Sequence, residues 1–466
     1  MANADILVLM TDQHRADWIG AFGGSWVRTP ALDGLANEGV VFTNCTTSSP
    51  LCMPARVSFL TGMYPHNFGM WDNLGRLHDV DDTILHPLRA AGYRTCHVGK
   101  SHLHPHGNGR DVREAEPYMH ALGWDDVLEC TGPLSTQTTK SMLTDWMEAE
   151  GLYQTFLDDY RRRAQHASGP DLWPSPLPDG KHMDDFIADT AVNYISDSDT
   201  SQPLYLFVGI GGPHNPFDPT ARFDTYRPED MPPPLPADPA PEWLDGPALA
   251  YHDQMTRHNR EVTPDEWARM RSLYSGKVEH VDYLLGRVLD AWYRRRGRDT
   301  WVIFWTDHGE MLGDKRRTAK GVYYRASVRV PVILRPPGGL SCPTRQTCPT
   351  GLTDLSATVL DAAGCRPGAN VFGQSLLPAP QDANSVGHPV VFSELHHHTM
   401  VSDGRWKMLV DDGNQVLLLF DTQEDPDETL NLAGRCDTTE VVERLRGQLL
   451  EWLLRTAYRQ HRDVNG

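Results

Sequence analysis

Ile6-Leu7-Val8-Leu9-Met10-Thr11-Asp12-Gln13-His14 is the stretch that decides the fold class of this 466-residue chain. Its first five residues form a continuous apolar run, which is typical of a strand buried on both faces of a parallel sheet. Polar residues follow directly where such a strand would end. In open α/β sheets, ligands bind outside the carboxyl ends of the strands. The stretch therefore predicts a central parallel strand that leads into a functional site.

Three more strand-like stretches end in polar residues. Residues 301–305 lead into Asp307-His308, residues 93–98 into Lys100-Ser101-His102, and residues 204–208 toward Pro213-His214. Since parallel strands end at one edge of their sheet, we expect these side chains to converge in one crevice. Taken singly, the aspartates are also consistent with helix caps, and the lysine and histidines with ordinary loop residues.

The segment Ser49-Pro50-Leu51-Cys52-Met53-Pro54-Ala55-Arg56-Val57-Ser58-Phe59-Leu60-Thr61-Gly62 predicts the start of a helix. Pro54 suits the first helical position, because its missing N–H costs nothing there. Cys52 would then lie at the helix N-terminus, beside unpaired amide donors and the positive end of the dipole, where anions bind. The alternative is a buried cysteine in an ordinary turn, since free cysteine is among the most buried residue types.

The pattern Cys-x-Pro-x-Arg followed by Leu-Thr-Gly resembles the signature of the type I sulfatases, which are alkaline phosphatase-like enzymes. Other motifs occur in the chain order of that family, and the resemblance covers nearly the whole chain: Asp12-Gln13, Lys100-x-His102, Pro213-His214, Asp307-His308 and Lys320. The resemblance implies that a formylglycine-generating enzyme oxidises Cys52 to formylglycine, whose hydrate is the nucleophile.

The resemblance also implies a divalent cation and a role for each polar residue. The predicted metal ligands are Asp12, Gln13, Asp307, His308 and an oxygen of the modified Cys52. Calcium and manganese both fit, and the histidine nitrogen makes manganese more plausible than in an all-oxygen site. The predicted catalytic residues are Cys52, Arg56, Lys100, His102, His214 and Lys320.

In the implied mechanism, one hydroxyl of the hydrate attacks sulfur while three cations offset the charge on the nonbridging oxygens: Arg56, Lys100 and Lys320. His214, with Lys320, protonates the departing alcohol, and His102 takes a proton from the second hydroxyl. The predicted activity is hydrolysis of a sulfate monoester, so the chain is expected to be a sulfuric ester hydrolase.

Departures from the commonest family pattern leave the substrate open. Sulfatases often carry two aspartates in place of Asp12-Gln13, and many carry Asp-Asn in place of Asp307-His308. The site is therefore similar to the branch that contains phosphonate monoester hydrolases and choline sulfatases. A phosphonate monoester or phosphodiester hydrolase that uses the same groups is the alternative. After Tyr324, where relatives often carry acidic residues, this chain has Arg325-Ala326.

Two hypotheses from other classes fit the sequence less well. A binding protein on a decayed enzyme scaffold would not need Cys52, Arg56 and Lys320 together. A zinc phosphatase of the wider alkaline phosphatase group would use a serine or threonine nucleophile and more histidine and aspartate ligands.

The predicted fold class is α/β, with a mostly parallel central sheet flanked by helices and a smaller C-terminal α+β subdomain. We expect a catalytic domain over residues 1–385 and the subdomain over residues 390–466. Thr263-Pro264-Asp265-Glu266 is a capping box that predicts a long helix reaching toward Arg296. Residues 405–410 and 416–420 predict paired strands, and residues 441–454 an amphipathic terminal helix.

Composition limits the classes of partner. The net charge is -19, from 43 basic and 62 acidic residues, whereas a nucleic-acid binder would show a basic face. The eight cysteines include no CxxC pair and no zinc spacing, so we expect reduced thiols. The apolar run at residues 6–10 is too short for a signal core and lacks a basic lead, which predicts a cytoplasmic protein without a membrane span. The expected substrate is a small anionic ester, and the sequence leaves homo-oligomerisation open.

Overall fold

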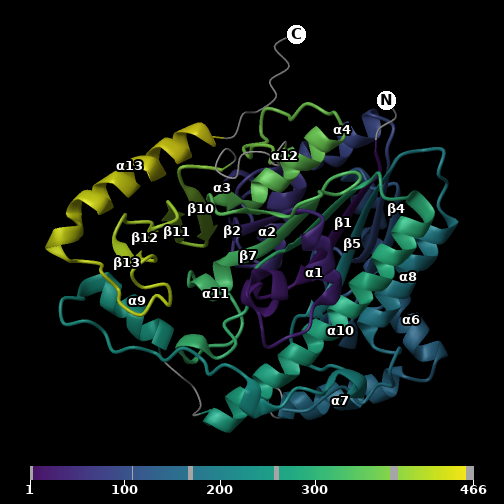
Figure 1. Cartoon of the computed structure of the whole chain (residues 1–466), viewed down its shortest axis with the longest axis horizontal. Coiled ribbons are helices and arrows are strands. Elements are labelled where there is room, and N and C mark those ends of the chain that lie inside the picture. Colours follow the sequence, from purple (N-terminus) through teal and green to yellow (C-terminus); the bar gives the residue numbers. More distant parts are fainter. Residues whose placement is uncertain (1–3, 108, 166–171, 257–261, 378–386, 458–466) are drawn as a thin grey trace.

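The computed structural model describes residues 4–107, 109–165, 172–256, 262–377 and 387–457. A large sheet crosses the centre of the molecule with helices on both faces, and a smaller sheet lies at one end (Figure 1). The predicted α/β class with a C-terminal antiparallel subdomain is confirmed.

The strands of the large sheet follow one another in the order β4 (Asp126–Cys130), β3 (Arg94–Lys100), β5 (Leu204–Pro213), β1 (Ile6–Asp12), β6 (Trp301–Thr306), β7 (Arg329–Arg335), β2 (Val40–Thr46) and β8 (Thr344–Gln346), and β9 (Thr350–Gly351) also pairs with β2. Within the described ranges, these strands pair in parallel except where β7 meets β6 and β2. The four strands predicted to converge, β3, β5, β1 and β6, are therefore consecutive and parallel.

The two faces of the large sheet bury two separate apolar layers. Along β1, Leu7 and Leu9 pack into the layer formed with α1 (Pro30–Asn37), α6 (Met142–Ala149), α7 (Tyr153–Gln165), α8 (Met183–Asp197) and α10 (Pro264–Arg296). Ile6, Val8 and Met10 face the opposite layer, with α2 (Cys52–Thr61), α4 (Leu85–Ala90), α5 (Glu116–Ala121) and α12 (Leu352–Ala362). Burial on both faces explains why this strand reads as a continuous apolar run, since neither face meets water.

The capping box at the start of α10 is confirmed. The Thr263 side chain accepts a hydrogen bond from the Glu266 backbone N–H, and Pro264 is the first helical residue. The helix ends at Arg296, as predicted, and lies beside α8 on one face of the sheet (Figure 1).

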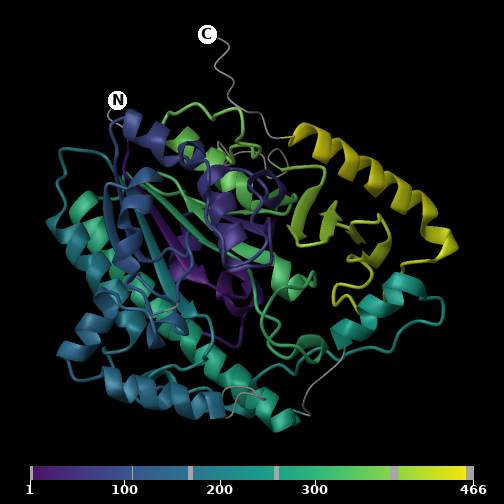
Figure 2. The same ribbon diagram turned by 180° about the vertical axis from the view of Figure 1, so that it is seen from behind.

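The C-terminal sheet consists of four consecutive antiparallel strands, β10 (Val391–Leu395), β11 (His398–Ser402), β12 (Trp406–Asp411) and β13 (Val416–Asp421), within the part of the chain that the structure describes. The predicted strand pair and terminal helix are confirmed as β12, β13 and α13 (Thr439–Arg455). Leu445, Leu449 and Trp452 of α13 pack on this sheet, and the helix forms its outer flank (Figure 2). The predicted division at residues 385–390 falls partly in residues 378–386, which lie outside the described residues, and stays a prediction.

Three further α-helices of the described ranges are α3 (Pro65–Phe68), which contacts β10, α9 (Gly246–Thr256), which contacts β13, and α11 (Arg325–Val328), which contacts β7. Among the described helices, none combines the length and the apolar composition that a membrane crossing requires.

Candidate active site

The carboxyl ends of β3 and β1 bring Lys100 and Asp12 into direct contact. Asp12 is the last residue of β1, and a bulge in the pairing with β5 falls between Thr11 and Asp12. One oxygen of its carboxylate, Oδ2, accepts a hydrogen bond from Lys100 Nζ and lies 2.9 Å from an Arg56 guanidinium nitrogen. Burial would raise the pKa of Asp12, but the charges of Lys100, Arg56 and Lys320 hold it well below its usual range. Asp12 is therefore a buried anion.

Cys52 is the first residue of α2, so its predicted place at a helix N-terminus is confirmed. The prediction for Pro54 was wrong by two positions: α2 begins at Cys52, and Pro54 is its third residue. The proline is tolerated there because the first four N–H groups of a helix have no intrahelical acceptor. Cys52 Sγ lies 3.1 Å from His308 Nε2. Burial opposes thiolate formation, but Lys320 and His308 outweigh it and lower the pKa of Cys52.

Four side chains offer ligand atoms that all lie within 4.8 Å of one another: Asp12, Cys52, Asp307 and His308. The His308 Nδ1–H donates to the Gly309 carbonyl at 3.0 Å, which turns Nε2 toward this group. The second Asp12 oxygen, Oδ1, is buried without a hydrogen-bond partner among the described residues. Because an unpaired buried carboxylate oxygen is costly, this donor set fits a divalent cation.

Arg56 holds both carboxylates of this set. Its Nε donates to Asp307 Oδ2 at 2.9 Å, one terminal nitrogen lies 2.9 Å from Asp12, and the other donates to the carbonyls of Lys100 and Ser101. A contact between Arg56 and the substrate oxygens is predicted from the sequence. In the structure this guanidinium instead orients the carboxylates, and its direct contact with substrate stays a prediction.

Gln13 is fixed from three sides. Its backbone has a positive φ of 61°, and its N–H donates to Asp307 Oδ1 at 3.1 Å. Its amide nitrogen donates to Glu310, and its amide oxygen accepts from Lys320 Nζ. The amide oxygen, the only side-chain atom of Gln13 able to bind a cation, is therefore occupied by an ammonium in this structure.

Lys320 also contacts His214. The His214 Nδ1–H donates to the Asn215 carbonyl at 2.7 Å, so its Nε2 is the acceptor for Lys320 Nζ at 3.0 Å. Burial and the lysine charge lower the pKa of His214 well below its ordinary value. The pair therefore carries its proton on Lys320.

His102 follows β3 with a positive φ of 52° and a buried Nδ1 that has no partner among the described residues. Burial and the Lys100 charge lower its pKa well below the ordinary value. Its ring lies 5.1 Å from the ring of His106, which with His104 flanks Glu129 at 3.0 and 2.9 Å. This histidine–glutamate cluster was not predicted from the sequence.

Two further residues that support the site were also missed. Buried Glu310 accepts hydrogen bonds from the Leu312 and Ala319 backbones and from the Gln13 amide. The Thr47 hydroxyl donates to the Asp307 carbonyl at 2.6 Å. Glu310 stands three residues after Asp307, next to a predicted strand end, so its position could have indicated a role in the site. Nothing in the sequence around Thr47 indicated its contact with Asp307.

Comparison with known families matches residues 4–365 to the family described as Sulfatase. Residues 313–454 match the family described as N-sulphoglucosamine sulphohydrolase, C-terminal. The two matches overlap and together span most of the chain.

The chain is also similar to individual proteins. It is 27% identical over 474 residues to an arylsulfatase of Clostridium perfringens (strain 13 / Type A), covering 96% of this chain and 94% of that protein. It is 28% identical over 450 residues to a choline-sulfatase of Rhizobium meliloti (strain 1021), covering 92% and 82%. The crystal structure of a phosphonate monoester hydrolase of Agrobacterium radiobacter has the same fold, with a TM-score of 0.78, 23% identity, and coverage of 97% and 96%.

Proposed function

The chain belongs to the sulfatase family, and from this premise we propose that it hydrolyses sulfate monoesters with a formylglycine hydrate at residue 52 as the nucleophile. The observation that supports this most is the buried group of Asp12, Cys52, Asp307 and His308 at the start of α2. Cys52 Sγ marks the place from which the hydroxyls of the modified residue would project. The conversion requires a formylglycine-generating enzyme, and a cytoplasmic location remains part of the proposal.

Asp12, Gln13, Asp307, His308 and an oxygen of residue 52 would hold the metal, either calcium or manganese. When bound, the cation would polarise the ester oxygens and make a hydroxyl of residue 52 a stronger nucleophile. For Gln13 to take part, Lys320 must release the Gln13 amide oxygen, which it occupies in this structure. The Lys320 ammonium is then free to turn toward the substrate.

The chain supplies the charges that the transition state needs. Lys100 and Lys320 face the nonbridging oxygens and offset their charge, in a buried place where such interactions are strong. We assign Arg56 to a positioning role, because its three guanidinium nitrogens already contact Asp307, Asp12 and two backbone carbonyls.

Three proton transfers complete the reaction. The attacking hydroxyl of residue 52 loses its proton to solvent as its oxygen bonds to sulfur, and the chain's residues carry the other two protons. Lys320 donates a proton to the departing alcohol, and His214 orients the ammonium through its Nε2 lone pair. His102 accepts a proton from the second hydroxyl of residue 52, which releases sulfate and restores the aldehyde.

The His214→Ala variant should show which substrates need a proton donor held in place, because His214 orients the Lys320 ammonium. We expect kcat for an alkyl sulfate to fall about 10²-fold or more, because an alkoxide is a poor leaving group. For an aryl sulfate with an acidic phenol, the loss should be several times smaller, since the phenolate leaves without protonation. Steady-state kinetics with both substrates measures the difference. His397→Ala, at an exposed hairpin position, is the control, and equal losses on both substrates would contradict the assignment.

The alternative, a phosphonate monoester or phosphodiester hydrolase, is favoured by the neutral ligands Gln13 and His308, which leave more positive charge at the metal. We expect the enzyme to prefer singly charged substrates and to hydrolyse both aryl sulfates and phosphonate monoesters, with sulfate esters favoured in kcat/KM. Specificity is set by that ratio.

A substrate panel with one shared leaving group tests the proposed function. The expected order is sulfate monoester above phosphonate monoester and phosphodiester, with the dianionic phosphate monoester last. A higher kcat/KM for the phosphonate monoester or phosphodiester would replace the proposed function with the alternative. A preference for the phosphate monoester would contradict both.

A further inference from the structure

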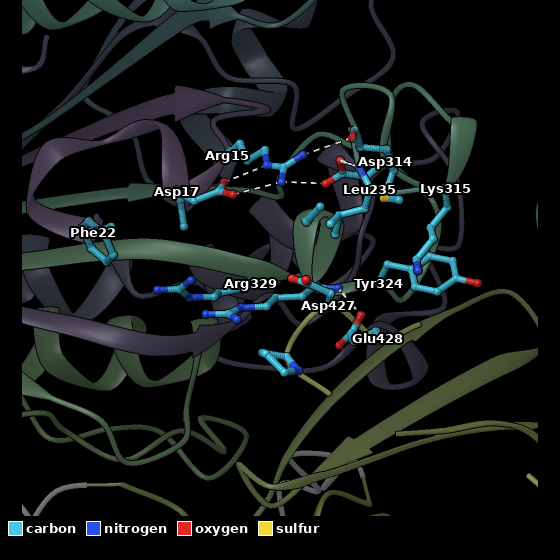
Figure 3. Close-up of a pocket in the computed structure, with 15 residues that line it drawn as sticks. Arg15, Asp17, Phe22, Leu235, Asp314, Lys315, Tyr324, Arg329, Asp427 and Glu428 are labelled. Atoms are coloured by element: carbon cyan, nitrogen blue, oxygen red, sulfur yellow. Dashed lines mark hydrogen bonds and ion pairs between the residues drawn. The ribbon is translucent and has the colours of Figure 1, made fainter. Parts of the chain in front are cut away.

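A cavity of about 220 Å³ lies between the large sheet and the C-terminal subdomain (Figure 3). Its walls come from the segments that follow β1 and β6, from α11, and from the loop after β13. They include Arg15, Asp17, Asp314, Arg325, Arg329 and Glu428. None of the predicted catalytic or metal-binding residues is among its lining residues.

Most charges around this cavity are matched within the protein. Arg15 lies between Asp17 and Asp314, at 2.7 and 2.6 Å, on the other side of the cavity from Arg329 (Figure 3). Asp314 also forms an ion pair with a second arginine, Arg271, at 2.6 Å. Lys315 pairs with Asp238 at 3.0 Å, and Glu428 pairs with Lys407.

Among the basic residues that line the cavity, Arg325 and Arg329 are the exceptions. Neither side chain forms an ion pair with any carboxylate of the described residues. Arg329 donates its Nε–H to the Thr43 carbonyl at 2.8 Å, which leaves its terminal nitrogens available. Both arginines also line an adjoining cavity of about 260 Å³, so their guanidinium groups border open space on two sides.

The surroundings of Arg329 are electrostatically unfavourable for a cation. Burial and the neighbouring Arg325 charge lower the pKa of Arg329 to about 10. The cavity has one acid without a basic partner among the described residues, Asp427, and this side chain is exposed. The carboxylates of Asp17, Asp314 and Glu428 also line the cavity, but each already pairs with another basic residue. Arg325 is exposed and Arg329 is partly buried, and an unpaired charge is costly where it is buried.

We propose that Arg325 and Arg329 form a second anion-binding site, separate from the site around Cys52, which takes a tetrahedral oxyanion of the sulfate or phosphate class. Guanidinium groups present paired N–H donors that match the oxygens of such anions. An external anion would supply the negative charge that no carboxylate of the described residues gives these two arginines.

The proposed site borders the segment that carries the metal ligands. The Glu310 backbone N–H donates to the Ala326 carbonyl at 3.0 Å, and the Gly309 N–H donates to the Ser327 carbonyl at 2.8 Å. There is no room for a side chain at Gly309, where a Cβ would lie 1.9 Å from the Ala326 oxygen. The helical turn with Arg325 is therefore fixed against the residues that follow His308.

Equilibrium dialysis with radiolabelled inorganic sulfate tests the proposal. The full chain is produced without a formylglycine-generating enzyme, so Cys52 stays a thiol and no turnover is involved. We expect Arg325→Glu to bind one sulfate fewer per chain than the wild type, because the new carboxylate pairs with Arg329. Sulfate bound near Cys52 is common to both proteins and cancels in the difference.

Three variants separate this site from a loss of folding. Arg325→Glu should melt no lower than the wild type, because it replaces a like-charge contact with an opposite-charge one. Asp427→Asn should tighten sulfate binding about threefold, since it removes an exposed negative charge from the edge of the cavity. Arg227→Gln, at an exposed arginine paired with Asp230, should bind as the wild type does.

Competition identifies the anion. If phosphate displaces the Arg325-dependent sulfate more readily than unlabelled sulfate does, the site is assigned to phosphate. If phosphate displaces it less readily, the site is assigned to sulfate. Equal sulfate binding by wild type and Arg325→Glu would overturn the proposal, and so would displacement by acetate as effective as that by phosphate. Because the assay involves no hydrolysis, either failure would leave the proposed sulfatase activity untouched.

Discussion

Replacement of Cys52 by alanine is expected to lower kcat by about 10⁴-fold or more, since the nucleophile itself is removed. Alanine cannot be oxidised to an aldehyde, and no other described side chain at the start of α2 can take its place. The fold should survive, because one buried sulfur is lost from a helix whose core residues are unchanged. We expect the free energy of unfolding to fall by about 1 kcal/mol. Steady-state turnover and thermal unfolding by circular dichroism measure the two effects.

Cys45 provides the matched control, since it is an equally buried cysteine in β2. Cys45→Ala should keep wild-type turnover while losing a similar amount of stability. Turnover at the wild-type rate by Cys52→Ala would contradict the mechanism, and an equal loss of activity in both variants would show that the effect is structural.

The second large effect is expected for Asp307→Ala, which should abolish metal binding and, with it, turnover. The change removes a charged ligand from a site with few others. It also leaves three donors without their acceptor: Arg56 Nε, the Gln13 N–H and the His308 N–H. Elemental analysis of the purified protein after gel filtration should show no bound divalent cation. Chelation of the wild type should abolish turnover in the same way, with recovery when the metal is returned.

Asp282 is the control for this experiment, because it is a buried carboxylate that accepts hydrogen bonds from the start of α1, at Ala31 and Leu32. Asp282→Asn should retain full metal occupancy. Full occupancy in Asp307→Ala would instead show that the metal binds at another place.

The apolar runs predicted the centre of the sheet well, because strands buried on both faces leave a simple pattern in the sequence. The ends of the strands were predicted less well. The strand predicted over residues 204–208 continues to Pro213, since Gly209 and Ile210 keep pairing with Met10 and Thr11. Glycines carry no apolar signal, so the pattern stops before the hydrogen-bonded ladder does.

The site was predicted as a set of residues, but not as a set of contacts. Chain order and residue type brought Asp12, Cys52 and Asp307 into one group, which the structure places together. The direction of each hydrogen bond depends on residues far apart in the chain. Arg56 therefore contacts carboxylates where the sequence suggested substrate, and Glu310 was overlooked.

The proposed anion site at Arg325 could not be predicted from the sequence either. The sequence marked Arg325-Ala326 as a departure from its relatives, but gave no sign that Arg329 lies beside it without a carboxylate. The position of Arg329 beside Arg325 becomes visible only in the structure. There, α11 and β7 pack against the loop after β13, which brings residues about 100 positions apart to one cavity.

The measurement that tests the central claim most directly compares turnover with the state of residue 52 in the same protein samples. Peptide mass spectrometry gives the fraction of chains that carry the aldehyde at residue 52, in preparations made with increasing amounts of a formylglycine-generating enzyme. We predict that kcat per chain rises in proportion to this fraction and extrapolates to zero when residue 52 is entirely cysteine. Turnover at the full rate by protein whose residue 52 is an unmodified thiol would contradict the account.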